Sequence, residues 1–387
     1  MPPILGSTVP QCLYIHIPFC LKKCDYCDFY SISGSSPEML ERYSAALLSE
    51  IDRQAASFPA HHIRSIYFGG GTPSLLSVSQ ITAILERILL RFSVDSRAEI
   101  SLEANPATID QNKLAGMVKA GVNRLSLGVQ SFDDGELRML GRVHSSRQAR
   151  ETLRLIADLP LKNYNVDLIY GLPGQSINGW LNNLRQAVAF GPQHISMYLL
   201  QLEPDTPMGQ AVEDNRLLLL GEDSEAEMYY AGIDYLSAQG YRQYEISNLS
   251  RPGAECRHNM FYWQAESYLG LGAGAVSFAQ GRRWRNQPDM QAYLAAHQSK
   301  QDGLTEELER MDQPGLIADA VILGLRMTEG IDLAAFAGRF GLDLADRYDE
   351  TIRRCQAEGL LEMKHGRLFL TRAGYFLSNQ VMRRFLD

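Results

Sequence analysis

Hydrophobic positions follow two different spacings along the first 205 residues. Three- and four-residue spacing, typical of amphipathic helices, occurs at 37–58, 77–92, 110–120, 133–141, 145–159 and 176–190. Short apolar runs typical of strands lie between them, at 12–17, 65–68, 100–103, 124–127, 166–170 and 194–200. This alternation indicates a parallel sheet with helices outside it. Since six strand–helix units are fewer than the eight of a closed barrel, we expect an α/β fold with an open, partial TIM-type barrel.

The rest of the chain predicts two further parts. Residues 206–300 lack the clean alternation, so we expect an α+β extension there, in which the glycine-rich stretch 269–278 packs closely against backbone or a flat ring. Helical spacing returns near 313–327, 332–340 and 344–358, followed by a hairpin around Gly366. We therefore expect three domains, at 1–205, 206–300 and 301–387.

Composition and charge narrow the class of protein. The 387 residues are 45% hydrophobic and 21% charged, which is ordinary globular usage. A net charge of −8 argues against binding a phosphate backbone, so we expect no nucleic-acid partner. No apolar run reaches the roughly 18 residues of a membrane span. A secretory signal begins with a basic segment, and no Lys or Arg precedes Lys22 in this chain. We expect a cytoplasmic protein, with peripheral membrane contact left open.

Three of the six cysteines lie close together and are the strongest chemical signal. Cys20, Cys24 and Cys27 are spaced C-x-x-x-C-x-x-C after the first predicted strand. Three thiolates suit a soft metal or an iron–sulfur cluster, and a 4Fe–4S cluster with three protein ligands keeps one iron open. The alternative is a structural zinc site with His16 as its fourth ligand. The other cysteines lack ligand spacing and are expected to be buried thiols: Cys12, Cys256 and Cys355.

The segment from Tyr14 to Cys27, YIHIPFCLKKCDYC, resembles the cluster loop of the radical S-adenosylmethionine superfamily. The resemblance implies a 4Fe–4S cluster on the three cysteines, whose open iron binds the amino and carboxylate groups of S-adenosylmethionine. It places Tyr26 near the adenine. In this superfamily the cluster passes an electron to the sulfonium and a 5′-deoxyadenosyl radical is released.

One further motif and four single residues match positions of that superfamily. The turn Gly69-Gly70-Gly71-Thr72-Pro73 is an ordinary strand-to-helix turn in isolation, and the resemblance implies contact with the methionine part of the ligand. Glu103 matches a position that contacts the same nucleotide. The last three residues match positions that hold a second S-adenosylmethionine in the coproporphyrinogen-oxidising branch: Gln130, Arg142 and Asp167.

The resemblance covers nearly the whole chain and narrows to the anaerobic coproporphyrinogen-III oxidase-like family. The dehydrogenase of that family has a fourth cysteine where this chain has Phe29, and a long extension before the first strand. Both departures favour the haem-chaperone branch. The motif H-N-x-x-Y-W, associated with haem in that branch, begins at His258 and makes it a candidate haem ligand, with Cys256 as a second contact. A packed histidine with satisfied hydrogen bonds is the alternative.

We therefore expect a haem chaperone that binds haem and passes it to an acceptor protein. The alternative is an oxygen-independent coproporphyrinogen III dehydrogenase, in which the radical attacks propionate side chains. The C-terminal part resembles a winged helix, but a DNA-binding regulator is less favoured because acidic residues are mixed with its basic ones. No catalytic residue is assigned. The residues expected to bind cofactors besides the three cysteines are Tyr14, Tyr26, Gly70, Gly71, Thr72, Pro73, Glu103, Gln130, Arg142, Asp167 and His258.

Overall fold

A computed structural model describes residues 9–58, 62–161, 163–299 and 305–386. Its centre is a twelve-stranded sheet in the order β14-β13-β12-β11-β1-β4-β5-β6-β7-β8-β10-β9. Six neighbouring parallel strands form the predicted barrel wall: β1 (Cys12–Ile17), β4 (Ile63–Gly70), β5 (Val94–Ala104), β6 (Arg124–Gln130), β7 (Tyr164–Tyr170) and β8 (His194–Leu199). Since β14 and β9 are the two ends of this order, the sheet is open among the described residues, as predicted.

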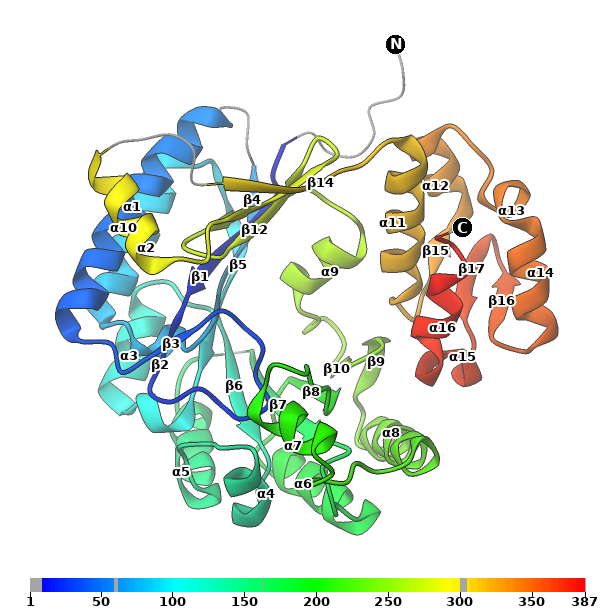
Figure 1. Ribbon diagram of the computed structural model, residues 1–387, viewed down its shortest axis with the longest axis horizontal. Coiled ribbons are helices and arrows are strands. Elements are labelled where there is room, and N and C mark those ends of the chain that lie inside the picture. Colours follow the sequence, from blue (N-terminus) through cyan, green and yellow to red (C-terminus); the bar gives the residue numbers. More distant parts are fainter. Residues whose placement is uncertain (1–8, 59–61, 162, 300–304, 387) are drawn as a thin grey trace.

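The predicted helices cover the outer face of the barrel wall (Figure 1). They are α1 (Pro37–Ser57), α2 (Val78–Arg91), α3 (Gln111–Lys119), α4 (Asp134–Met139), α5 (Ser146–Ala157) and α6 (Ile177–Ala189). Each begins at a Ser or Asp whose side chain accepts a hydrogen bond from a backbone N–H of the first turn. Their apolar faces pack on the sheet, as in α2, where Ile81, Ile84 and Ile88 are fully buried.

The extension, together with the first described residues after it, adds strands to both edges of this wall. On one side β11 (Tyr268–Leu271) runs parallel to β1, and β12 (Val276–Ala279), β13 (Arg282–Asn286) and β14 (Thr305–Arg310) follow it in antiparallel order. On the other side β10 (Asn248–Ser250) and β9 (Arg242–Glu245) pair beyond β8. The expected close packing of the glycine-rich stretch is confirmed, because a Cβ at Gly270 would collide with backbone at Val276.

The extension also carries four helices: α7 (Pro207–Glu213), α8 (Glu222–Ala238), α9 (Arg257–Trp263) and α10 (Met290–Ser299). Helix α10 lies beside α1, whereas α9 lies between the sheet and the C-terminal region (Figure 1). The cysteine loop contains the short parallel pair β2 (Phe19–Cys20) and β3 (Ile32–Ser33), and two 3₁₀ turns, η1 (Pro73–Leu75) and η2 (Pro106–Thr108), follow β4 and β5.

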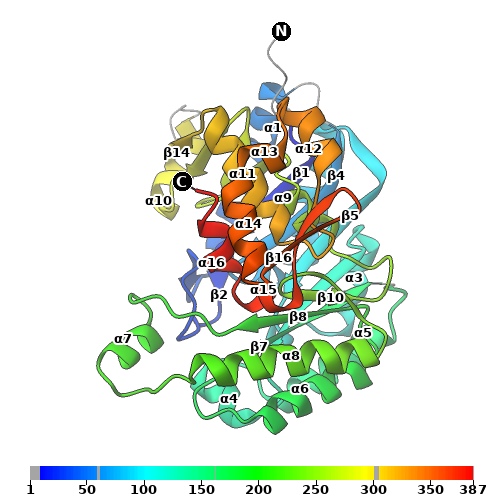
Figure 2. The same ribbon diagram turned by 90° about the vertical axis from the view of Figure 1, so that its right-hand side faces the viewer.

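The C-terminal region has its own hydrophobic cluster and stands above α8 in Figure 2. It contains α11 (Gln313–Leu325), α12 (Leu333–Phe340), α13 (Leu344–Arg347), α14 (Asp349–Ala357), α15 (Arg372–Phe376) and α16 (Ser378–Arg383). A small sheet joins β15 (Ile331–Asp332), β17 (Arg367–Leu370) and β16 (Leu361–Lys364). The single helix predicted at 344–358 is wrong: the backbone of Tyr348 leaves the helical region, and its ring packs edge-on against Phe385, 5.1 Å between centroids.

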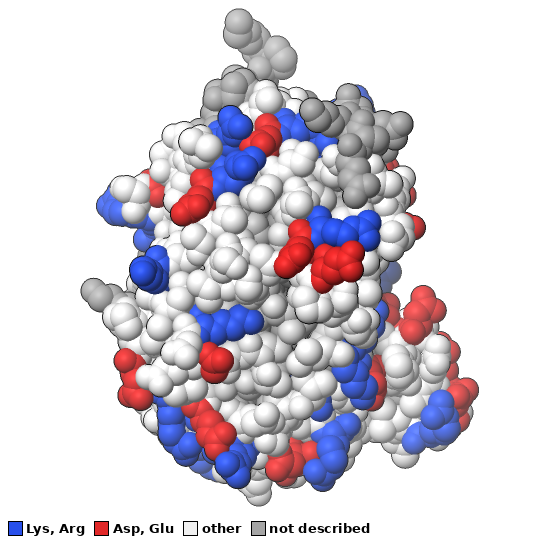
Figure 3. Space-filling view, turned by 90° about the vertical axis from the view of Figure 1, so that its left-hand side faces the viewer, with Lys and Arg blue, Asp and Glu red and all other residues white. Residues whose placement is uncertain are grey.

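Charged side chains of both signs lie next to one another on the face over α1 and α2 (Figure 3). Arg87 and Arg91 of α2, for example, both pair with Asp52 of α1. None of the described helices combines the length and apolar character that crossing a membrane requires.

Candidate functional site

A cavity of about 440 Å³ opens at the carboxyl ends of the parallel strands. The cysteine loop forms one wall, and strand ends and the turns after them form the other. This is the edge of a parallel barrel at which ligands bind. Most of the predicted site residues come together here: Cys20, Cys24, Tyr26, Cys27, Gly70, Gly71, Thr72, Glu103, Gln130, Arg142 and Asp167.

Backbone hydrogen bonds hold the cysteine loop against the cavity. The N–H of Asp25 donates to the carbonyl of Leu140 at 3.1 Å, and its carbonyl accepts from the N–H of Met208 at 2.9 Å. The loop is thereby tied both to the end of α4 and to the start of α7. The three half-buried thiols face a pocket whose shape is set by distant parts of the chain.

Polar donors surround the thiols. Arg142 Nη1 lies 3.4 Å from Cys24 Sγ, and Thr72 Oγ1 lies 3.6 Å from Cys20 Sγ. Burial raises the pKa of Cys20 and raises that of Cys27 to about 11. Holding these two as thiolates at neutral pH therefore needs positive charge beyond Arg142, which iron ions supply.

The zinc alternative lacks its proposed fourth ligand. Both ring nitrogens of His16 are engaged away from the cysteines, Nδ1 with the Tyr14 hydroxyl at 3.1 Å and Nε2 with the Tyr30 carbonyl at 3.0 Å. Within the described part of the chain, no three His, Cys, Asp or Glu side chains, the three cysteines included, lie close enough together to hold one metal ion. Three thiols beside a cation and a polar cavity suit a larger cluster with one iron facing the cavity.

Two of the predicted glycines are required by close packing of the chain. Gly70 has φ of 108°, and a Cβ there would lie 2.5 Å from the His16 ring. A Cβ at Gly71 would lie 2.7 Å from the Phe19 carbonyl oxygen. This packing brings the Gly70 N–H within 3.3 Å of the Glu103 carboxylate and leaves the glycine backbone lining the cavity.

Strain and unpaired polar atoms gather at the end of β6. Gln130 has φ of 67°, an unusual value for a residue other than glycine, and its buried Oε1 has no partner among the described residues. The buried Nε of Arg142 is also unpaired there, although its Nη2 donates to the Gly128 carbonyl at 2.6 Å. Such a backbone costs about 1–3 kcal/mol, as does a buried unpaired group. A polar ligand that pairs with Gln130 and Arg142 offsets part of this cost.

Two carboxylates complete the polar wall. Asp167 accepts hydrogen bonds from Ser126 at 3.0 Å and from Asn165 at 2.7 Å. Glu103 accepts one from the Tyr67 hydroxyl at 2.8 Å. Burial raises the pKa of both carboxyl groups, and the nearby Asp167 adds to the shift of Glu103, whose pKa reaches about 7.

A second cavity, of about 630 Å³, adjoins the first. Tyr67, Glu103 and Tyr198 line both cavities and form the wall between them, while Phe29 reaches both from the cysteine loop. The volume falls within the usual range for small-molecule sites. Six further aromatic side chains are among its remaining lining: Tyr14, Tyr30, Tyr262, Trp263, Tyr268 and Phe278. This second cavity, called the aromatic cavity below, suits a flat apolar ligand.

His258 lines the aromatic cavity but is 1% exposed and fully hydrogen-bonded. Its Nδ1 lies 2.8 Å from Ser65 Oγ and its Nε2 lies 2.9 Å from the Tyr262 hydroxyl. Burial, reinforced by Arg124, lowers its pKa to about 3, so the ring is neutral. Cys256 is equally buried, with its Sγ 3.6 Å from a Glu99 oxygen. This geometry matches the packed-histidine alternative, and ligation through Nε2 requires the Tyr262 hydroxyl to leave.

Of the remaining predicted residues, Tyr14 lines the aromatic cavity, and Pro73 is buried in η1 and lines neither cavity. Tyr67 was not among the predicted site residues, although it alternates with buried Ile66 and Phe68 along a predicted strand. That alternation placed it on the same inner face as Tyr14, its partner in register on β1.

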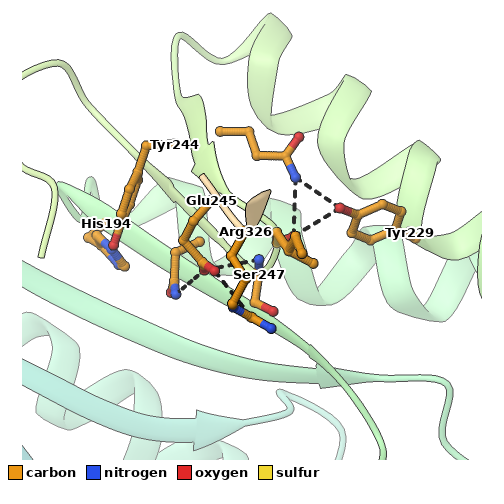
Figure 4. Close-up of polar contacts among 9 residues, drawn as sticks. His194, Tyr229, Tyr244, Glu245, Ser247 and Arg326 are labelled. Carbon is orange, nitrogen blue, oxygen red and sulfur yellow. Dashed lines mark hydrogen bonds and ion pairs between the residues drawn. The ribbon is translucent and has the colours of Figure 1, made fainter. Parts of the chain in front are cut away.

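A buried ionic contact joins the sheet edge to the C-terminal region beside the aromatic cavity (Figure 4). Glu245, at the end of β9, is fully buried and accepts hydrogen bonds from Asn248, from the Ser247 N–H at 3.0 Å and from Arg326 Nη2 at 3.3 Å. Arg326, which follows α11, also lies over the ring of Trp263, 4.2 Å from its centroid. The end of α9 is thereby fixed to the C-terminal region.

Known proteins resemble this chain over nearly its whole length. The model of the radical SAM superfamily matches residues 14–187, and that of the HemN C-terminal domain matches residues 311–377. The heme chaperone HemW of Bacillus subtilis (strain 168) is 34% identical over 377 residues, covering 96% of this chain and 98% of that protein. The heme chaperone HemW of Escherichia coli (strain K12) is 40% identical over 278 residues, covering 70% of this chain and 72% of its own.

The solved structure of coproporphyrinogen III oxidase (HemN) from Escherichia coli superposes with a TM-score of 0.85. The match covers 99% of this chain and 91% of that one, at 23% sequence identity. The two chains therefore share a fold, including the open barrel and the C-terminal region.

Proposed function

The chain belongs to the heme chaperone HemW family of the radical SAM superfamily, and on that premise we propose that it binds haem and transfers it to an acceptor protein. Membership of the superfamily implies a 4Fe–4S cluster and S-adenosylmethionine. We propose that the acceptor is another protein in the cytoplasm. The proposed transfer of haem involves no nucleic acid and no membrane-spanning segment.

The observation that carries this proposal is the aromatic cavity beside the cysteine loop. It is separated from the first cavity only by side chains that line both, those of Tyr67, Glu103 and Tyr198. A flat macrocycle in the aromatic cavity would therefore lie next to the cofactors, where their state can affect its binding or release. Rings and hydroxyls line the cavity as they do other porphyrin pockets.

We assign the cluster to Cys20, Cys24 and Cys27, with Arg142 offsetting thiolate charge beside Cys24. In the first cavity, Tyr26, the glycine backbone of 70–71 and Thr72 would hold S-adenosylmethionine. When bound by these cysteines, a reduced cluster would supply an electron. Glu103 offers a hydrogen-bond acceptor, and three further residues provide the polar end of the cavity: Gln130, Arg142 and Asp167.

A second candidate function, coproporphyrinogen III dehydrogenation, is favoured by one observation. The strained Gln130 and the unpaired Nε of Arg142 remain in the first cavity, as a catalytic nucleotide site would require. The exposed Phe29 stands where the dehydrogenase has a cysteine, and this difference argues for the chaperone.

Anaerobic reconstitution tests both functions on one preparation. We expect the reconstituted protein to bind haem with a stoichiometry of about one in an absorbance titration, and to release it to an apo-haemoprotein. We expect no protoporphyrinogen when coproporphyrinogen III, a reductant and S-adenosylmethionine are supplied. Sustained protoporphyrinogen formation would favour the dehydrogenase function over the chaperone function. Failure to bind haem would contradict the chaperone function.

The cysteine assignment has its own test. Cys24→Ser is expected to lose the iron and sulfide of a 4Fe–4S cluster after reconstitution, whereas Cys355→Ser, a buried thiol far from the loop in the C-terminal region, keeps them. A full cluster complement in Cys24→Ser contradicts the assignment. Zinc in place of iron in an anaerobic preparation restores the zinc alternative.

A further inference from the structure

Two arginines of β13 line the aromatic cavity at the sheet edge. Arg283 and Arg285 are two residues apart, so they face the same side of the strand, while Arg282 faces away. Neither has a role in the cofactor site. Arg283 also lies over the Phe278 ring, 5.5 Å from its centroid, so it contacts the aromatic wall directly.

Two residues that line this cavity each have a buried N–H group without a partner in the described part of the chain. The two groups are Arg285 Nε and Trp263 Nε1. Guanidinium and indole nitrogens donate hydrogen bonds and do not accept them. An occupant that satisfies them must therefore carry acceptor atoms as well as a flat apolar surface, and beside arginine the best acceptor is a carboxylate.

Carboxylates of the chain already contact these arginines. Glu306 of β14 lies 2.7 Å from Arg285 Nη2. Arg283 is held by two carboxylates, Glu309 at 2.8 Å from Nη1 and the less exposed Asp319 of α11 at 3.1 Å from Nη2. Of the two arginines, Arg285 is therefore the one whose only carboxylate partner among the described residues is an exposed glutamate. Both glutamates are exposed on a strand at the edge of the sheet. Exposed ion pairs of this kind contribute little to folding stability, so another carboxylate can exchange with them at small cost.

We propose that Arg285, with Arg283 beside it, binds the carboxylates of the tetrapyrrole that occupies the aromatic cavity, and that Glu306 holds Arg285 until the ligand arrives. This inference rests on the proposed haem-binding function and adds the residue that recognises the propionate groups. The macrocycle contacts the aromatic wall, while its carboxylates replace Glu306 at the guanidinium.

Two probes and three variants test this recognition. The probes are ferric haem and haem dimethyl ester, which has the same ring and iron but no free carboxylate. The variants are Arg285→Gln, Glu306→Gln and Arg282→Gln. Arg282 is the matched control, because it is on the same strand and pairs with Glu307 of β14 but does not line the cavity. Affinity is measured by absorbance titration of the reconstituted protein, and folding by circular dichroism.

We expect Arg285→Gln to weaken haem binding about tenfold or more and to leave binding of the dimethyl ester within about twofold. Glu306→Gln removes the competing carboxylate and is expected to tighten haem binding a few-fold. Arg282→Gln should match the wild type with both probes. A gain in affinity from Glu306→Gln cannot come from damaged folding.

Other outcomes overturn the proposal. Equal binding of haem by wild type and Arg285→Gln would remove Arg285 from recognition, and an equal loss with both probes would assign it to the shape of the cavity. In either case the wild type still binds haem and the proposed function stands. If the wild type binds neither probe, the proposed function itself fails.

Discussion

At the residue scale, Glu103 makes the stability of the cofactor-free protein depend on pH. Its folded pKa of about 7 lies above the ordinary 4.5, mainly because of burial. Between these values the folded chain keeps a proton that the unfolded chain has lost. Stability therefore falls as pH rises from about 4.5 to 7, by at most about 3 kcal/mol. Glu103→Gln is expected to remove the part of this fall that Glu103 causes, measured by urea unfolding at pH 5 and pH 8.

Glu307→Gln is the control for this measurement. Arg310 and Arg282 lower the pKa of Glu307 through hydrogen bonds, so its stabilising ionised form is present throughout that pH range. Its substitution should therefore change stability equally at pH 5 and pH 8. If wild type and Glu103→Gln show the same pH dependence, the carboxyl at 103 is not protonated in the folded state.

Tyr262 controls access to His258, since its hydroxyl lies 2.9 Å from Nε2. Tyr262→Phe frees that nitrogen without removing the ring, and one neutral hydrogen bond corresponds to about fivefold in affinity. We expect tighter haem binding and a stronger histidine-ligand spectrum in this variant, both lost in Tyr262→Phe/His258→Ala. Tyr30→Phe, which also alters an aromatic residue of this cavity, should bind haem as the wild type does. Identical spectra in Tyr262→Phe and Tyr262→Phe/His258→Ala would exclude His258 as ligand.

The cysteines and the strand-end residues could be predicted because each lies in a short motif with defined spacing. The three isolated cysteines were also correctly expected to be buried. Arg285 lies in no such motif. Its proposed role depends on sharing a cavity with Trp263 and on its ion pair with Glu306, and neither contact can be predicted from the sequence. The hydrogen bonds of His258 likewise depend on Ser65, 193 residues away along the chain.

At the element scale, helical spacing was sufficient for the six helices that cover the barrel wall, since each buries one face, and short apolar runs were sufficient for the six parallel strands. The pairing of β11 with β1 was not predictable, because it joins residues 268–271 to 12–15 and depends on the closing of a long loop. The break at Tyr348 was missed because helical spacing of apolar residues continues across it.

Glu50 of α1 stabilises the edge of the sheet that begins with β11. Its buried carboxylate accepts hydrogen bonds from the Gly272 N–H at 2.8 Å, and from Asn286 and Tyr293 at 2.6 Å. Glu50→Leu leaves these donors unpaired and is expected to destabilise the protein by about 3 kcal/mol or more in urea unfolding. Glu41→Leu, on the exposed face of the same helix, should change stability by less than about 0.5 kcal/mol. Equal effects would show that the edge strands do not depend on this carboxylate.

At the scale of the whole molecule, the sheet and the C-terminal region meet at α9 and share the aromatic cavity. The barrel contributes Tyr14 and Tyr67 to its lining, and α11 contributes Asp319 and Leu323. Composition and charge could indicate no such arrangement, since they describe neither neighbours nor cavities. The division into domains at 205 and 300 stays a prediction, although residues 206–300 supply strands to both edges of one sheet.

Two ion pairs attach the C-terminal region and differ in burial. Arg326 pairs with the fully buried Glu245, whereas Arg372 pairs with Asp234 where both side chains are more than half exposed. Arg326→Ala leaves a buried carboxylate without its cation, so we expect a loss of about 3 kcal/mol and faster hydrogen exchange in α11. Arg372→Ala should cost less than about 1 kcal/mol.

A double substitution decides whether the stability lost in Arg326→Ala comes from the unpaired charge of Glu245. Glu245→Gln removes the carboxylate that Arg326→Ala strands, so the double variant should lose less stability than the sum of the two single losses. Additive losses would instead assign the effect of Arg326 to its contact with the Trp263 ring. Because Trp263 lines the aromatic cavity and Glu245 does not, haem affinity separates the cases: loss of the ring contact alters haem binding, and loss of the ion pair alone leaves it unchanged.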